Sequence, residues 1–293
     1  MNASRKSMQY GVAKAITEST DSEWDPFADA GPDQIERYDE LRRRCPVAHS
    51  QALGWSLFRH EDVMRALNDS GTFSNAVSVH KAVPNGMDPP EHTAYRRIID
   101  PFFTPERMSA LEPRLRTIAV ALMGRMTAGA EIEVMSELAD DFALQSQCAF
   151  LGWSAGAHAP LRNWMRSNHA AVRSRDRSAM AAVATQFDSH IRAVLALRRT
   201  RSYAATNDVT SELLDASVAG RPLSDDEIVS ILRNWTVGEL GTIAASIGIL
   251  MHHLAVYPQL QARLRADTAC LPAAIDEILR LDAPLISARR RTT

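Results

Sequence analysis

The uneven distribution of proline is the feature that most limits how this chain can fold. Of its 14 prolines, nine lie in the first 113 residues. Between Pro113 and Pro284 the chain has four, at positions 160, 222, 258 and 272. Because proline removes a backbone donor and interrupts a helix interior, the long intervals between these positions predict long helices.

The spacing of apolar residues also predicts helices. One helical face is formed by residues that recur at intervals of three and four, namely Leu111, Leu115, Ile118, Leu122 and Met126. The same spacing, more weakly, joins Ile191, Val194, Leu195 and Arg198. Further helices are expected over 60–67, 210–219, 225–232 and 234–257. Ser224 followed by three acidic residues is typical of a capped helix start.

Strand signals are confined to the beginning of the chain. Residues 47–50 and 55–58 flank a turn that ends at Gly54, which predicts a small hairpin. The sequence shows no internal repeat and no low-complexity linker. We therefore expect a mobile N-terminus over residues 1–20 and a single, mainly helical domain over residues 21–293.

The composition excludes several classes of protein. The 293 residues include 33 Lys and Arg against 35 Asp and Glu, a net charge of −2, which argues against nucleic-acid binding or a polybasic membrane tether. No apolar run reaches the length of about 18 residues that spans a membrane, and the N-terminus lacks a signal peptide's apolar core. Three distant cysteines, Cys45, Cys148 and Cys270, form no disulfide framework. A cytoplasmic protein is the expectation.

Common catalytic motifs are absent. The sequence contains no G-x-G-x-x-G, no P-loop, no G-x-S-x-G and no H-E-x-x-H. The adjacent pair His252 and His253 cannot present both rings on one helical face, so we interpret it as helix surface with one ring partly buried rather than as a metal site.

The segment Asp88 to Arg97, DPPEHTAYRR, is the first that carries chemistry. Its two prolines predict an extended approach to a helix that begins directly after them. His92 and Arg96 then lie four residues apart on one face, where they can hold a carboxylate by charge-assisted hydrogen bonds. Taken alone, the same spacing is also typical of a solvated first turn.

The segment Trp235 to Ser246 is the second that carries chemistry. Gly238 and Gly241 interrupt a strongly apolar helix, and each costs about 1 kcal/mol relative to alanine. Such glycines mark close approach by another group or a local kink. The hydroxyl of Thr242 can bond to the carbonyl one turn earlier or serve a ligand in an opened groove. Tight helix packing on the glycines, with Thr242 bonded back to the helix, is the structural alternative.

Glu277 and Arg280 form the third pattern. Glutamate and arginine three residues apart can pair on a helix. The apolar neighbours Ile275, Ile278, Leu279 and Leu281 predict partial burial, in which case loss of one partner would cost on the order of 3–5 kcal/mol. As an isolated pattern, E-x-x-R is usually a surface ion pair.

Together and in this order, these segments resemble the cytochrome P450 family, the haem–thiolate monooxygenases, in its soluble bacterial form. Cys45-Pro46-Val47 resembles the lead into the family's first small sheet. Residues 88–105, DPPEHTAYRRIIDPFFTP, are similar to the family's helix that binds the haem propionates, and residues 234–248 to its long central helix. The resemblance covers residues 25–293. It implies a mainly α, cytochrome P450-like helical domain with a small N-terminal β-sheet, incomplete at the C-terminus.

The resemblance implies roles for individual residues. His92 and Arg96 would bind the haem propionates, and Arg289 takes the place of a further propionate-binding arginine. Gly238 and Gly241 would face the cofactor, with Thr242 as the oxygen-handling threonine. Glu277 and Arg280 match the family's structural E-x-x-R pair.

Two positions depart from the family pattern. An acid usually precedes the threonine, but here the position is Gly241, so proton delivery would pass through Glu239 or water, or be weakened. The haem-ligating loop F-x-x-G-x-x-x-C-x-G is missing, and none of the three cysteines replaces it. That thiolate supplies the electron push for O–O cleavage. We therefore expect a chain that is C-terminally truncated, without the axial metal ligand and inactive alone.

For the complete protein, the resemblance implies a haem b-dependent monooxygenase that inserts one atom of O2 into an organic small molecule. Its electrons would come from a ferredoxin or similar donor with its reductase. Arg96, Arg97 and Arg107 can form a basic docking patch for that donor, or an ordinary solvated helix face.

Three interpretations remain open: part of a monooxygenase, a haem-free relative that binds or activates another enzyme, and an unrelated helical protein. The presence of His92, Arg96 and Arg289 argues against the haem-free relative.

Overall fold

The computed structural model describes residues 24–26, 31, 33–78, 81–174, 176–200, 208–285 and 287–293. They group into two compact units, one of residues up to Ser74 together with Arg290–Thr293, and one of Asn75–Arg289. The mobile N-terminus expected over residues 1–20 lies outside the described residues. A single domain over 21–293 stays a prediction, and each unit is described by itself.

The smaller unit contains the predicted hairpin. Its elements are α2 (Gln34–Arg44), β1 (Val47–Ser50), β2 (Gly54–Leu57), α3 (His60–Asn68), β3 (Phe73–Ser74) and β6 (Arg291–Thr292). In the hairpin, Val47 pairs with Leu57 and Ser50 with Gly54. Gly54 has a φ of 72°, a left-handed conformation that glycine adopts without strain. Strands β3 and β6 pair antiparallel. The helix predicted over 60–67 is confirmed as α3.

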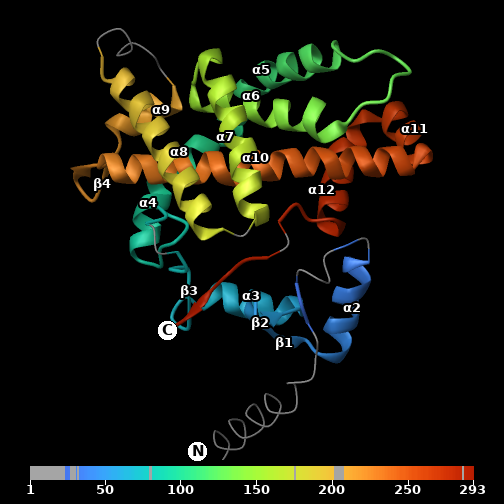
Figure 1. Ribbon diagram of the computed structural model, residues 1–293, viewed down its shortest axis with the longest axis horizontal. Coiled ribbons are helices and arrows are strands. Elements are labelled where there is room, and N and C mark those ends of the chain that lie inside the picture. Colours follow the sequence, from blue (N-terminus) through green and yellow to red (C-terminus); the bar gives the residue numbers. More distant parts are fainter. Residues whose placement is uncertain are drawn as a thin grey trace, which may run out of the picture. The chain divides into compact units, whose positions relative to one another are not determined.

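The larger unit is almost entirely helical (Figure 1). Its elements are α4 (Glu91–Ile99), η1 (Asp100–Phe103), α5 (Pro105–Met123), η2 (Met135–Ala139), α6 (Asp140–Leu151), η3 (Ala155–Ala157), α7 (His158–Ser174), α8 (Arg177–Arg198), α9 (Val209–Asp215), β4 (Ser217–Val218), β5 (Arg221–Pro222), α10 (Asp225–Val256), α11 (Pro258–Ala266), η4 (Thr268–Cys270) and α12 (Leu271–Leu281). The mainly α fold class expected from the sequence is confirmed.

Helix α10 is the axis of the larger unit, and Figure 1 shows it running the length of that unit. Ser224 and Glu227 form a capping box at its start, as the acidic run predicts. Ile228, Ile231 and Leu232 are buried in the main core. The two helices predicted over 225–232 and 234–257 are one continuous helix of 32 residues.

By length and composition alone, α10 is long and apolar enough to cross a membrane. The sequence predicts no such segment, because Arg233 and Glu239 interrupt the apolar run. In the larger unit α10 packs against α6, α8 and α12. The central helix of a globular protein has the same apolar composition, so this helix alone is weak evidence for a membrane span.

Two helix predictions are wrong in part. The helix expected over 210–219 ends at Asp215, because Ala219 and Gly220 turn the chain with φ values of 49° and 79° to form the β4–β5 hairpin. Pro113 lies inside α5, which ends at Met123, before Met126 of the predicted face. Both Pro113 and Ser109, whose carbonyl loses its helical donor, are exposed, so water can satisfy that carbonyl. On the predicted face of α5, Leu122 is buried whereas Leu111, Leu115 and Ile118 are only partly covered.

Candidate functional site

The middle of α10 has an open face. The helix is buried through Trp235 and Thr236, but the next residue, Val237, is 39% exposed. Gly238, Glu239 and Gly241 are also exposed, while Leu240 and Ala244 remain buried on the opposite side. A Cβ atom added at Gly238 or Gly241 would meet no atom of the described residues within 4 Å. The alternative of tight packing on these glycines is therefore wrong, since both line open space.

Thr242 lies at the edge of this open face. Its Oγ1 donates to the carbonyl of Gly238 at 2.8 Å and lies 3.3 Å from the carbonyl of Glu239. Ser246, one turn later, donates to the carbonyl of Thr242 at 2.7 Å. The back-bonded alternative considered from the sequence thus describes Thr242 in this structure. Side-chain bonds of this kind loosen the helix ladder and favour bending.

Glu239 is the acidic side chain on the open face. Solvent reaches the side chain, yet the crowding of protein around its carboxyl removes part of the hydration and raises its pKa above the ordinary value of 4.5. A raised pKa lets this carboxyl hold a proton more readily than an exposed glutamate does. That property suits a group that transfers protons.

Helix α4 carries His92 and Arg96 four residues apart, as the sequence predicts. His92 is partly buried, and Arg96 is exposed and pairs with Asp100 at 2.5 Å. The extended approach expected from the two prolines is wrong at its last residue, because Pro90 has helical angles of φ −84° and ψ −15°. Tyr95 and Ile99 are buried and anchor the adjoining stripe of the helix.

The segment before α4 is bound to α10 just ahead of the open face. Asn234 Nδ2 donates to the carbonyl of Val83 at 3.0 Å, and the Val83 amide donates to Ser230 Oγ at 2.9 Å. Sequence reasoning missed these contacts. The signal was present, since Ser230 and Asn234 are polar and four residues apart on one face of an apolar helix.

The E-x-x-R pair lies on the surface of α12. Arg280 donates two hydrogen bonds to Glu277, each of 2.7 Å, and the side chains are 64% and 58% exposed. The expected partial burial is wrong for this pair, since Ile275 and Leu281 are exposed as well, although Ile278 is buried and Leu279 partly buried. Arg289 follows α12 in the larger unit and is exposed.

Each of the three cysteines is buried or hydrogen-bonded within its own segment. Burial raises the pKa of Cys148 to about 12, so its thiol stays neutral. Cys270 donates to Asp267, and Cys45 to the carbonyl of Val47 in the smaller unit. The described residues contain no group of three or more His, Cys, Asp or Glu that could hold a metal ion. The interpretation of the adjacent histidines as helix surface with one ring partly buried is confirmed: His252 is exposed, and His253 is partly buried and contacts Asp282 at 2.6 Å.

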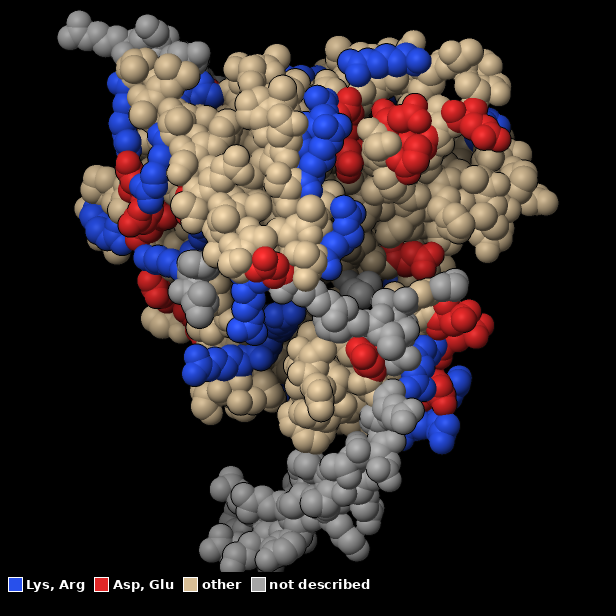
Figure 2. Space-filling model, viewed as in Figure 1, with Lys and Arg blue, Asp and Glu red and all other residues tan. Residues whose placement is uncertain are grey.

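The proposed basic patch is incomplete. Arg107 binds Glu212 through both of its terminal nitrogens and lies over the ring of Phe102 at 5.0 Å. The charge of Arg107 is therefore paired with a carboxylate of the protein itself. On the face drawn in Figure 2, basic and acidic side chains are interspersed. The docking interpretation is thus weakened for Arg107 and for Arg96, whereas Arg97 is exposed.

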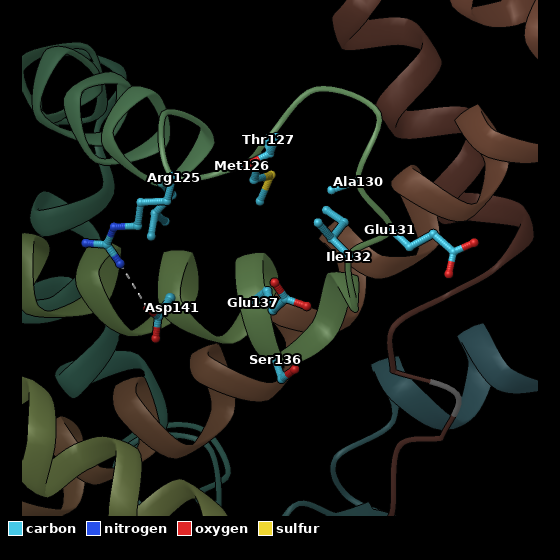
Figure 3. A pocket seen from close by; sticks show the side chains of 10 residues that line it. Arg125, Met126, Thr127, Ala130, Glu131, Ile132, Ser136, Glu137 and Asp141 are labelled. Carbon is cyan, nitrogen blue, oxygen red and sulfur yellow. Dashed lines mark ion pairs between the residues drawn. The ribbon is translucent and has the colours of Figure 1, made fainter.

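A separate cavity of about 320 Å³ lies where α5 ends and η2 and α6 begin (Figure 3). Arg125 and Asp141 approach to 3.7 Å across one side of it. None of the site residues predicted from the sequence lines this cavity. It is therefore distinct from the open face of α10.

The chain matches no family model, but it is similar to curated bacterial proteins. It is 27% identical over 265 residues to the erythromycin C-12 hydroxylase of Saccharopolyspora erythraea. It is 30% identical over 235 residues to a probable cytochrome P450 127A1 of Sinorhizobium fredii, and 26% identical over 272 residues to a cyclomarin C epoxidase of Salinispora arenicola. These alignments cover 86%, 77% and 87% of the chain, but only 66%, 55% and 68% of the three relatives.

Solved structures show the same relationship. Ligand-free cytochrome P450 TbtJ1 superimposes with a TM-score of 0.78 at 29% identity, covering 90% of this chain and 70% of that one. A mutant of P450 EryK in complex with erythromycin B gives a TM-score of 0.74 at 26% identity, covering 84% and 65%. Agreement in sequence and in helical architecture shows that this chain belongs to the cytochrome P450 family.

Proposed function

We propose that this chain forms the propionate-binding edge and the oxygen-binding face of the haem site of a monooxygenase, which inserts one atom of O2 into an organic small molecule. The observation that carries the proposal is the open face of α10. In the middle of a core helix, Gly238 and Gly241 border space that the described residues leave open. A flat cofactor needs such a face.

The residues present fit haem in part. The cofactor of the family is haem, whose two propionates are carboxylates. Arginine and histidine are suited to bind carboxylates by charge-assisted hydrogen bonds, and His92, Arg96 and Arg289 supply these groups. The open glycine face suits a flat ring. No cysteine among the described residues suits the axial position, so this chain's own residues account for the edge and one face of the cofactor only.

The bound haem would supply oxygen binding and activation, which no side chain provides. His92 and Arg96 would hold and orient the propionates. Arg96 already pairs with Asp100, so a propionate would share or replace that carboxylate. This exchange costs little because both side chains are exposed to water.

Thr242 and Glu239 would manage protons on the open face. The Thr242 hydroxyl donates to the Gly238 carbonyl in this structure, and rotation about χ1 would turn it toward the open space. Glu239 would supply the proton, because its pKa is raised by loss of hydration. Gly241 leaves room between them, where the family usually has an acid.

The substrate is proposed to be a small organic molecule, with a ferredoxin-type electron donor and its reductase as partners. The relatives named as an erythromycin hydroxylase and a cyclomarin epoxidase support oxygen insertion into such molecules. The nearly balanced charge supports a cytoplasmic setting without nucleic-acid partners.

The test is the absorption spectrum of the polypeptide that carries this sequence, purified from its native host. We expect bound haem. The shift upon reduction and CO binding that marks thiolate ligation would show that the purified polypeptide also carries the cysteine ligand that this chain lacks. Haem-free protein from haem-sufficient cells would overturn the proposal. It would instead favour the haem-free relative that binds or activates another enzyme.

A further inference from the structure

One carboxylate of the larger unit is bound far more extensively than a helix cap requires. The Glu227 side chain is 4% exposed. It accepts hydrogen bonds from Arg221 Nη1 and Nη2, each at 2.8 Å, and from the Ser224 amide at 2.8 Å. Lys81 Nζ lies 3.3 Å from Oε1. The capping box accounts for the Ser224 contact alone, so the other partners call for a second explanation.

The remaining partner of Glu227 comes from helix α4. The hydroxyl of Tyr95 donates to Glu227 Oε1 although the two residues are 132 positions apart. Tyr95 is only 2% exposed, so its polar end is buried together with the carboxylate. Arg221 holds the pKa of Glu227 well below its ordinary range, and burial raises the pKa of Tyr95. At neutral pH the carboxylate therefore accepts and the phenol donates.

The bond between Tyr95 and Glu227 matters because of where Tyr95 lies in α4. Tyr95 lies in the same two turns as His92 and Arg96. A short helix moves as one body, so the point where Tyr95 is bound sets where both of those side chains lie. At the start of α4, the N-cap residue Pro90 makes no side-chain capping bond. The restraint there comes from Asp88, whose carboxylate accepts from the amide and the side chain of Asn75.

Glu227 is also connected to the open face of α10. Glu227 lies in the first turn of α10, and Gly238 and Thr242 follow on the same continuous helix. Bonds from Ser230 and Asn234 hold residues 81–83 along the turns between them. Glu227 therefore joins the helix with the anion-binding residues to the helix with the open face.

We propose that Glu227 is a positioning residue, which acts through Tyr95 to hold His92 and Arg96 at the spacing from α10 that haem binding needs. This inference rests on the proposed function. It goes beyond it by assigning cofactor affinity to two residues that do not touch the cofactor. If the network only stabilised the fold, removing Tyr95 or removing another partner of Glu227 would have the same effect on haem binding.

The test compares two variants within the same network. Tyr95→Phe keeps the ring and removes the bond that links α4 to Glu227. Arg221→Gln removes an ion pair from Glu227 and a 3.3 Å bond from Arg221 Nη2 to the Tyr95 hydroxyl, but leaves the bond between Tyr95 and Glu227 in place. Haemin is titrated into the full chain by absorbance, and the thermal unfolding of each haem-free protein is recorded. A third variant, Asp141→Asn, removes the charge of Asp141 from a part-buried pair with Arg162 between α6 and α7 and serves as a control for general destabilisation.

We expect Tyr95→Phe to weaken haemin binding by about tenfold, the size of a lost hydrogen bond to a charged group. Arg221→Gln and Asp141→Asn should stay within about twofold of wild type, even where they lower the unfolding temperature. Hydrogen exchange of the α4 amides in the haem-free protein should accelerate in Tyr95→Phe and not in Asp141→Asn.

Each outcome decides a separate question. Wild-type haemin affinity in Tyr95→Phe, or equal losses in Tyr95→Phe and Arg221→Gln, would overturn the positioning role while haem binding by the wild type stood. A wild-type chain that binds no haemin would instead overturn the proposed function, and this inference with it.

Discussion

Gln147 Nε2 donates a hydrogen bond of 3.1 Å to the main-chain carbonyl of Trp235. Gln147 is buried on α6, and Trp235 lies one turn before Glu239 on α10. The Trp235 carbonyl, which also accepts the hydrogen bond of the helix at the start of the open face, thus has a second donor from a neighbouring helix. This contact holds α10 to α6 at the point where the helix changes from buried to exposed.

Replacing Gln147 by Met keeps the volume of the side chain and removes this donor. We expect a loss of about 1 kcal/mol in the free energy of unfolding, because the Trp235 carbonyl keeps its helical partner and only one net hydrogen bond disappears. Urea denaturation followed by circular dichroism measures the change. A variant as stable as wild type would show that the contact adds nothing to the packing of α6 on α10.

In a longer polypeptide that also carries the haem-ligating cysteine loop, Thr242→Ala should raise the release of peroxide relative to product. The proposed reason is that the hydroxyl at the edge of the open face no longer controls the proton. Thr242→Ser keeps the hydroxyl and should behave like wild type. Peroxide and product are measured in the same reaction, and unchanged coupling in Thr242→Ala would leave Thr242 as a helix-bonded packing residue.

The stability of the larger unit should depend on Glu227 in acid. Its folded-state pKa lies below the ordinary value of 4.5 because Arg221 binds the ionised form. The stabilisation is therefore complete above the unfolded-state pKa and is lost as pH falls from about 5 toward the folded-state value. The difference in unfolding free energy between wild type and Glu227→Gln should shrink over that interval. A difference that stays constant down to pH 3 would contradict this linkage.

The two arginines of the sequence patterns should differ in their effect on stability. Arg280 pairs with Glu277 on the surface, so Arg280→Ala should leave the unfolding temperature of this chain nearly unchanged. Arg198 is buried, pairs with Asp208 at 3.1 Å and bonds to the carbonyl of Gly152. Arg198→Gln should cost on the order of 3 kcal/mol, since it strands a partly buried carboxylate. Thermal unfolding of both variants tests the contrast, and equal losses would refute it.

Features that depend on residues within one helical turn could be predicted from the sequence, whereas features that depend on contacts between distant segments could not. The capping box at Ser224 and the spacing of His92 and Arg96 depend on residues within one turn, and both were predictable. The end of the 210–219 helix was not, because a tight turn at Ala219 and Gly220 overrides its apolar pattern. The open space at Gly238 and the bond from Tyr95 to Glu227 depend on segments far apart in sequence, which periodicity does not relate.

The central claim is that His92 and Arg96 on α4 bind the carboxylates of a haem that lies on the open face of α10. Haemin titration of the chain tests it most directly, with wild type compared to the double variant His92→Ala/Arg96→Ala. Arg97→Ala, an exposed neighbour on the same helix, is the matched control. We predict one haem per wild-type chain and an affinity at least about tenfold weaker in the double variant, with Arg97→Ala unchanged. Equal haem affinity in wild type and the double variant would contradict the account.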